Sequence, residues 1–211
     1  LAIANLHRGA IASVRGEFHK VLALVPAAQS CIPPENNLVH ARAFFSLGIA
    51  HENAGNIGHA VENYLRASKE ARTAGVSFLA VNSLCSAAQA QIQQGFLRLA
   101  EQTCQDAIHL VGGTRIPPLG LAWVILGTLA LERNDLSSAE NYLIDGITLS
   151  RQGELRADLI TGLFSLGLLK TYHGDQTGMQ AVMNEALSVI RSIDIPRIEQ
   201  LAYARIARYQ H

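Results

Sequence analysis

Apolar residues recur at helical spacing along this chain, and residues 38–76 show the pattern in its clearest form. The first apolar positions of this segment recur at helical spacing and predict a helix of about four turns; they are Leu38, Ala41, Phe44, Phe45, Leu47, Gly48 and Ile49. A second helical pattern runs from Ile57 to about Thr73. Between them, Gly55 supplies a left-handed residue and Asn56 is a candidate N-cap. Because the turn is short, the two helices are expected to be antiparallel neighbours.

Small residues return in the same phase every 39 or 40 positions. One series is Gly9, Gly48, Ala88, Gly127 and Gly167. A second is Ala28, Ala67, Ala107, Gly146 and Ala186, and a third, at the expected turns, is Gly16, Gly55, Gly95, Asn134 and Gly174. Three series with one period indicate an array of copies of a single supersecondary unit. The copies are expected at 2–37, 38–76, 77–115, 116–154 and 155–195, with half a copy at 196–211.

The recurring glycine has a packing explanation. Gly48 is expected to face its partner helix, where a larger side chain would push the two backbones apart. Ala60 is expected at the matching place on the second helix, with Tyr64 filling the wider gap beyond. A glycine inside a helix costs about 0.5–1 kcal/mol relative to alanine. Its recurrence therefore indicates that close helix packing offsets this cost.

Composition narrows the class of protein. Hydrophobic residues make up 49% and charged residues 16% of the 211 positions, as in a globular chain with a substantial core. The formal net charge is zero and the basic residues are scattered, so no nucleic-acid footprint is predicted. The uncharged stretch 116–131 is shorter than the roughly 20 apolar residues of a membrane span.

The N-terminal residues and the cysteines predict where the protein acts and whether the sequence is a piece of a longer protein. The N-terminus has no secretory signal pattern. Cys31, Cys85 and Cys104 form no dense framework, which favours reduced thiols in a cytoplasmic protein. The repeat pattern is already running at residue 3, and residue 1 is Leu rather than Met. We therefore expect the sequence to be a piece of a longer protein.

At this point the residues resemble the tetratricopeptide (TPR) repeat. Trp123-x2-Leu126-Gly127-x2-Ala130 resembles its W-x2-L-G-x2-Y pattern, and Phe44-x2-Leu47-Gly48 followed by Ala60, Tyr64 and Ala67 matches it better still. The period of 39–40 exceeds the usual 34, and the closing proline is missing. Each copy is therefore expected to carry about one extra helical turn or a longer connection. The resemblance covers the whole chain and implies an all-α, right-handed α-α superhelix, a single solenoid over residues 1–211.

Elongated TPR repeats of this kind are similar to those of maltose-activator-like, large ATP-binding regulators of the LuxR type. The segments 116–122, 132–140 and 144–147 carry this likeness. In that family the array lies between a nucleotide-binding module and a helix-turn-helix, and it receives an inducer or a regulatory protein. The resemblance therefore implies a non-catalytic sensor or interaction domain. The alternative is a general TPR scaffold unrelated to transcription.

In TPR arrays the first helix of each pair lines the concave binding surface. Counted from Gly48, the face that turns away from the partner helix predicts a ligand- or partner-binding set, namely Arg42, Phe45, Ile49, Glu52, Asn53, Asn82, Gln89, Gln93, Thr128, Glu132, Phe164 and Tyr172. Cys85, Ile92, Leu121, Val124, Leu131, Thr161, Leu168 and Thr171 share this face. Its second-repeat part offers amides, whereas the later repeats are mostly apolar. Three alternatives remain open for the apolar positions: burial against neighbours, groove lining, and a small-molecule pocket.

The sequence contains no motif that is typical of a catalytic or a metal-binding site. His51 and His59 are expected on different helices around a turn, and no H-x3-H or H-E-x-x-H occurs, so no metal site is predicted. Cys85 and Cys104 fall on the two helices of one copy and are expected to have packing roles. No nucleophile–base constellation is present, so neither an enzyme nor a cofactor is predicted.

The expected partner is a protein or peptide, or a small-molecule inducer. Only Arg42 is basic among the inner-face positions, so a clamp for a peptide's terminal carboxylate is not predicted. No membrane contact and no direct nucleic-acid contact are expected. The half copy at the C-terminus lacks its second helix, and Leu201, Ile206 and Ala207 are expected to favour self-association there.

Overall fold

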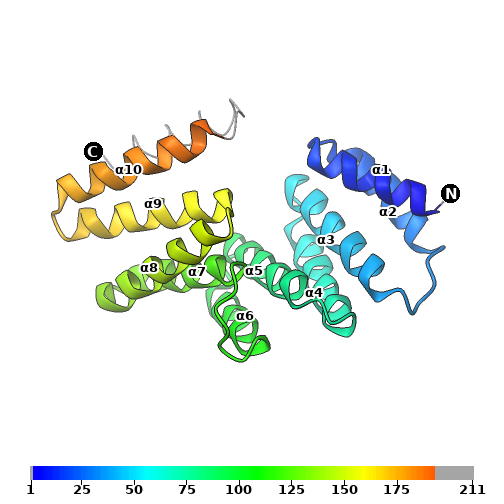
Figure 1. Ribbon diagram of the computed structural model, residues 1–211, viewed down its shortest axis with the longest axis horizontal. Helices are drawn as coiled ribbons and strands as arrows, with labels where there is room; N and C mark the ends of the chain where they lie inside the picture. The colour runs from blue at the N-terminus through cyan, green and yellow to red at the C-terminus, as the bar shows by residue number, and fades with distance from the viewer. Residues whose placement is uncertain (1, 193–211) are drawn as a thin grey trace. The chain divides into compact units, whose positions relative to one another are not determined.

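The computed structural model describes residues 2–192, which form ten helices and no strand, as the sequence predicted. The helices follow one another in antiparallel pairs (Figure 1). The chain divides into two compact units, unit 1 (Leu1–Thr114) and unit 2 (Arg115–His211). Unit 1 contains α1 (Ala2–Val14), α2 (Phe18–Gln29), α3 (Asn37–Asn53), α4 (Ile57–Thr73), α5 (Ser77–Gln93) and α6 (Leu97–Leu110). Unit 2 contains α7 (Leu119–Glu132), α8 (Leu136–Gln152), α9 (Arg156–Tyr172) and α10 (Gln176–Arg191).

The extra length of each copy lies in its helices. α3, α4 and α5 each have 17 residues, with three residues between one helix and the next. These connections are at the short end of the usual range for helix pairs, so an added helical turn, and not a longer connection, explains the 39–40-residue period in this part of the chain. The predicted half copy at 196–211, with its expected self-association, lies outside the described residues.

The five predicted turn residues all adopt the left-handed backbone. Gly16, Gly55, Gly95, Asn134 and Gly174 have φ between 59° and 80°. Glycine reaches this region without a steric cost, and asparagine tolerates it better than most residues. The turn series of the sequence is thereby explained by backbone geometry.

Capping differs from the expectation at Asn56. Asn56 stands at the N-cap of α4, but its side chain makes no capping hydrogen bond. In unit 2 the carboxylates of Asp135 and Asp175 accept from the backbone N–H groups of Ser138 and Gly178. Hydrogen bonds from the side chain and then the backbone of Ser138 lower the pKa of Asp135 below its usual value.

The recurring small residues lie where the two helices of a pair cross. A Cβ on Gly48 would come within 2.5 Å of the Tyr64 ring, so the ring itself occupies the close approach. The expectation that Ala60 fills this place is corrected, because Tyr64 is the nearest neighbour of Gly48. The same relation joins the other copies with a recurring glycine, in which Gly9 faces Val25, Gly127 faces Leu143, and Gly167 faces Met183.

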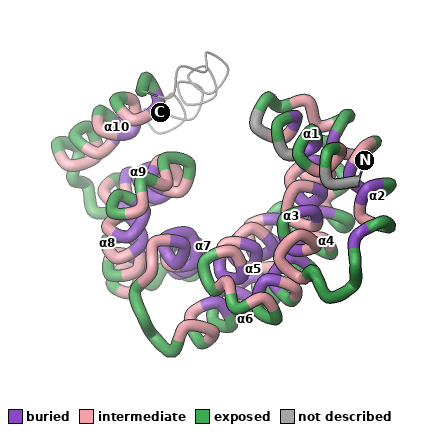
Figure 2. The backbone as a smooth tube through the Cα atoms, turned by 45° about the vertical axis from the view of Figure 1, so that its right-hand side comes forward, coloured by how far each residue is buried: buried purple, intermediate pink, exposed green. Residues whose placement is uncertain are grey.

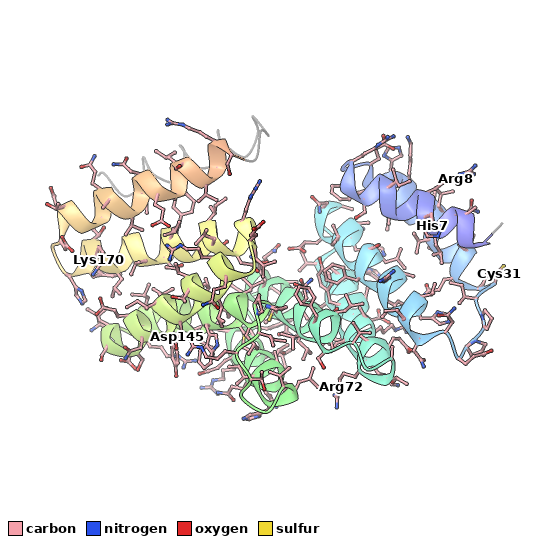
Figure 3. All side chains as sticks on the ribbon, in the orientation of Figure 1. His7, Arg8, Cys31, Arg72, Asp145 and Lys170 are labelled. Carbon is pink, nitrogen blue, oxygen red and sulfur yellow. The ribbon has the colours of Figure 1, made fainter. Side chains whose placement is uncertain are left out.

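In unit 2, helix α7 is buried along most of its length. Eleven residues of α7 are buried, and in Figure 2 this helix is largely purple. On the surface of unit 2, Asp145 accepts from Arg115, with Oδ1 2.7 Å from Nη2, and Lys170 Nζ lies 3.2 Å from Glu140 Oε1. Asp145 and Lys170 are labelled in Figure 3. None of the helices within residues 2–192 is both long and apolar enough to cross a membrane.

Candidate functional site

The predicted binding residues of unit 1 lie on an accessible side of α3 and α5. We call this surface the α3/α5 face. Arg42, Asn53 and Gln93 are exposed, and the half-buried members are Phe45, Ile49, Glu52, Asn82 and Gln89. All eight come from first helices, as predicted, but Phe45 and Glu52 also contact Tyr64 of the partner helix α4. Unit 1 therefore offers a polar and partly apolar surface on which a ligand could lie.

Glu52 is the centre of a hydrogen-bond network on this face. The Tyr64 hydroxyl of α4 donates to Glu52 Oε2 at 2.7 Å, and Gln93 Nε2 of α5 donates to Glu52 Oε1 at 2.6 Å. Glu52 lies in the last turn of α3, so three helices meet at one carboxylate. The sequence predicted Glu52 and Gln93 as site residues but assigned Tyr64 to packing alone.

An apolar floor lies beside the carboxylate. The rings of Phe45 and Tyr64 have centroids 5.6 Å apart and are tilted by 53°, a usual geometry for an aromatic pair. Phe45 and Ile49 pack against the buried cluster of Ala60, Tyr64 and Ala87. Tyr64 thus contacts the apolar floor with its ring and the carboxylate with its hydroxyl.

The groups that donate hydrogen bonds to Glu52 are both neutral. Burial raises the pKa of Tyr64 well above its usual value, and the charge of Glu52 and the hydrogen bond to it add to the shift. The phenol therefore remains a protonated donor. Among residues 2–192 Glu52 forms no ion pair with Lys, Arg or His. Glu52 is consequently an acidic group of the α3/α5 face that no described basic side chain pairs with.

Three further polar side chains of the face remain available. Arg42, Asn82 and Gln89 form no hydrogen bond or ion pair within the described part of the chain. Asn53 differs, because its Nδ2 donates to the Ile49 carbonyl at 2.9 Å. Amides have both donors and acceptors, so Asn82 and Gln89 can match the peptide backbone of a bound segment.

The predicted face is partly closed in unit 2. Leu121, Val124 and Leu131 are buried, and Phe164 is only 4% exposed and packs with Met183 and Ile190. The expectation that Phe164 lines an accessible face is therefore corrected. Of the three alternatives for the apolar positions, burial against neighbouring residues therefore describes these four, because the helices pack against one another there.

The close approach of α7 and α9 contributes to this closure at Val124. A Cβ on Gly162 of α9 would lie 2.9 Å from Val124 Cγ2 and 2.8 Å from Ile147 Cγ1. The residue at the same repeat position of α5 is Ser83, which is fully buried and has the side chain that Gly162 lacks. α9 can therefore come close to α7 in a way that α5 cannot match with α3.

The remaining predicted residues of unit 2 are dispersed. Thr128 Oγ1 donates to the Val124 carbonyl at 2.9 Å and lies 2.9 Å from Ser165 Oγ. Glu132 is exposed at the end of α7, and Tyr172 is 59% exposed at the end of α9. These three side chains do not join one another in a hydrogen-bonded network like that of Glu52.

Histidine and cysteine side chains of unit 1 bear on metal and redox chemistry. His51 and His59 stack across the α3–α4 turn with ring centroids 5.2 Å apart, and burial, followed by the charge of His59, lowers the pKa of His51. Within residues 2–192 no three His, Cys, Asp or Glu side chains come together as metal ligands. Cys85 and Cys104 are buried without a disulfide, and burial raises the pKa of Cys104.

Comparison with known proteins agrees with the repeat pattern and the helix pairs. The family model of the MalT-like TPR region matches residues 3–210. No curated protein matches the chain. Among solved structures, the apo form of RapI is similar over 92% of this chain and 71% of its own, with 14% identity and a TM-score of 0.74.

Two other solved structures have the same fold. BtubC from P. vanneervenii is similar over 88% of this chain and 78% of its own, with 17% identity and a TM-score of 0.65. TPR-like repeats of a kinesin light chain from Podosopora anserina are similar over 90% of this chain and 94% of their own, with 12% identity and a TM-score of 0.59. These likenesses support the TPR-like architecture of helix pairs.

Proposed function

The chain belongs to the family of MalT-like TPR regions, and from this premise we propose that it is the sensor and interaction domain of a LuxR-type transcriptional regulator. In this proposal the α3/α5 face binds a segment of a partner protein. A partner that binds one conformation of the array better than another shifts the population toward that conformation. The chain itself performs no catalysis and acts in the cytoplasm.

The observation that carries the binding role is the α3/α5 face. Asn82 and Gln89 keep their hydrogen-bonding groups unused, while Phe45 and Ile49 supply a partly buried apolar surface. An extended segment needs both kinds of contact, since its backbone requires amide partners and its side chains require apolar area. Unit 2 supports this role less well, because four of its corresponding side chains are buried.

A peptide-binding experiment tests this role. Peptides selected from a displayed random library on the whole chain should bind it in fluorescence anisotropy. The double substitution Asn82→Ala and Gln89→Ala should weaken that binding about tenfold, because two hydrogen bonds of about 0.5–1.5 kcal/mol each are lost. Gln102→Ala with Gln105→Ala is the matched control, since both lie exposed on α6. If both doubles bind equally well, the α3/α5 face is not the binding site.

A general TPR scaffold unrelated to transcription is the second candidate, supported by the likeness to TPR repeats from other kinds of protein. Sequencing the flanks of the parent gene separates the two. A nucleotide-binding loop upstream and a helix-turn-helix downstream would support the regulator, and a gene without them would rule it out.

A small-molecule inducer is a further candidate for the same face. Thermal shift against a metabolite set tests it on the whole chain. Stabilisation that Asn82→Ala abolishes would support direct sensing by these amides. A set without any stabilising compound would leave a protein partner as the proposed ligand.

A further inference from the structure

We infer that the α3/α5 face receives a basic side chain of the partner segment at Glu52, and that this side chain takes the place of Gln93. The inference rests on the proposed function, because it specifies the chemistry of the segment bound there. It also assigns different roles to three residues that meet at one point. Glu52 binds the cation, Tyr64 positions Glu52, and Gln93 occupies the carboxylate while no partner is bound.

The first support is the unused capacity of the Glu52 carboxylate. Two carboxylate oxygens offer about four lone-pair positions, and Tyr64 and Gln93 fill two of them. Both donors are neutral, and no cationic side chain pairs with Glu52 within residues 2–192. A guanidinium or ammonium group adds the attraction between opposite charges to the hydrogen bond, and a guanidinium can bond both oxygens at once, so either group would bind this carboxylate better than a neutral amide does.

Helix ends strengthen the negative potential at this point. Glu52 lies in the last turn of α3, and Gln93 is the last residue of α5. The C-terminal end of a helix carries about half a negative charge, which attracts cations. α5 has no basic residue in its last turn. His51 is in the last turn of α3, but its lowered pKa leaves the ring neutral near pH 7.

Tyr64 and Gln93 are suited to different roles. Tyr64 is buried and held by Phe45, so its hydroxyl fixes one oxygen of Glu52 without neutralising it. Gln93 is exposed, and its long side chain can leave the carboxylate for solvent. A bound cation therefore replaces the exposed neutral donor and keeps the buried one.

The neighbouring side chains fit the stem of a Lys or Arg. Ile49 precedes Glu52 by three residues, so the two share one side of α3. The methylene stem of a basic side chain can lie on Ile49 and Phe45 while its charge reaches Glu52. Arg42, the basic residue of this face, lies ten residues earlier on α3, roughly 15 Å away at 1.5 Å per residue. That separation exceeds the screening length of about 8 Å at physiological salt.

The experiment uses the selected peptides described above, with the whole chain in fluorescence anisotropy. Peptides that depend on Asn82 and Gln89 should share a Lys or Arg, and Glu52→Gln should weaken their binding about tenfold, as for loss of one charge-assisted hydrogen bond. Glu62→Gln is the matched control, since Glu62 is exposed on α4 and pairs with Arg66. Far-UV circular dichroism checks that each variant is folded.

Gln93→Ala is the more decisive variant, because we expect it to increase peptide affinity, whereas a variant that merely disturbs the structure lowers it. Removal of the competing amide should tighten binding by roughly two- to tenfold, the equivalent of one neutral hydrogen bond. Gln94→Ala, at the next position, should leave affinity unchanged. A charge exchange completes the test. The Glu52→Lys variant should no longer bind the basic peptide, and it should bind the same peptide once the peptide's Lys is replaced by Glu.

The outcomes separate the inference from the function on which it rests. If binding depends on Asn82 and Gln89 but is unaffected by Glu52→Gln and Gln93→Ala, the basic side chain is wrong and the peptide-binding face stands. If no peptide is recovered, or none responds to any of these four positions, both are overturned. Weaker binding in Gln93→Ala would show that Gln93 contacts the peptide, and would also overturn the displacement.

Discussion

Glu52 and Tyr64 of unit 1 occupy the same repeat positions as Leu131 and Leu143 of unit 2. In unit 1 the pair is joined by a hydrogen bond of 2.7 Å, and Glu52 stays half-buried beside an accessible face. In unit 2 Leu131 and Leu143 are 5% and 0% exposed and belong to one apolar cluster. The same backbone pattern therefore supports either a polar network open to a ligand or a closed core.

The largest effect is expected when a glutamate is placed at the equivalent position of unit 2. Leu131→Glu should lower the free energy of unfolding of unit 2 by more than about 3 kcal/mol, because a buried carboxylate without a partner is costly. Urea denaturation followed by the fluorescence of Trp123 measures this, since Trp123 is the one tryptophan of the chain. Ile144→Glu is the control, because Ile144 is already exposed.

Adding the tyrosine tests whether the pair is transferable. Leu131→Glu with Leu143→Tyr should recover part of the loss, since the phenol can donate to the new carboxylate. A double variant as unstable as the sum of the two single variants would show that the Glu–Tyr pair depends on its surroundings in unit 1.

Mild acid should stabilise unit 2 through Asp158. Burial raises the pKa of Asp158 from 3.8 to about 6. The folded state then binds more protons than the unfolded state between about pH 4 and 6, so the free energy of unfolding rises as the pH falls through that window. Asp158→Asn should remove this dependence and stabilise unit 2 at pH 7 by up to about 3 kcal/mol, at 1.36 kcal/mol for each pKa unit. Trp123 fluorescence in urea at several pH values measures both effects. Glu132→Gln, an exposed control, should retain the wild-type pH dependence.

The recurring glycines should differ in their tolerance of a methyl group. Gly48→Ala should destabilise unit 1 by about 1–3 kcal/mol, because the added Cβ meets the rigid Tyr64 ring. Gly167→Ala meets the terminal methyl of Met183, which can move aside, so its effect should be near neutral. Urea denaturation of each variant, followed by far-UV circular dichroism and Trp123 fluorescence, compares them. Equal losses in both would contradict the assigned neighbours.

The smallest expected effect concerns the Tyr64 hydroxyl. Tyr64→Phe keeps the ring contact with Phe45 and removes the donor to Glu52, so unit 1 should lose about 1 kcal/mol. Tyr172→Phe in unit 2 is the control and should change stability by less than about 0.5 kcal/mol, because its hydroxyl lies on an exposed side chain. A loss of several kcal/mol for Tyr64→Phe would mean that Glu52 holds the helices together more than it awaits a ligand.

Most of the fold could be predicted from the sequence. The end of α3 at Asn53 and the span of α4 from Ile57 to Thr73 agree with the expected turn and second helix. These features are local, because they follow from helical periodicity and from residues that tolerate a left-handed backbone. The site was less predictable, since helical counting gives the direction of a residue on its own helix and not the distance to the next helix.

The sequence by itself determined the repeat, its helix pairs and the positions at which the two helices of a pair cross, because each of these depends on residues close together along the chain. Tertiary structure alone decided which first helices leave a face accessible. Phe45 and Phe164 are equivalent in the repeat, yet one is half-buried on the α3/α5 face and the other packs with Met183 and Ile190. The linkage of Glu52 to Tyr64 and Gln93 was also beyond the sequence, because it joins three helices through contacts 12 and 41 residues apart.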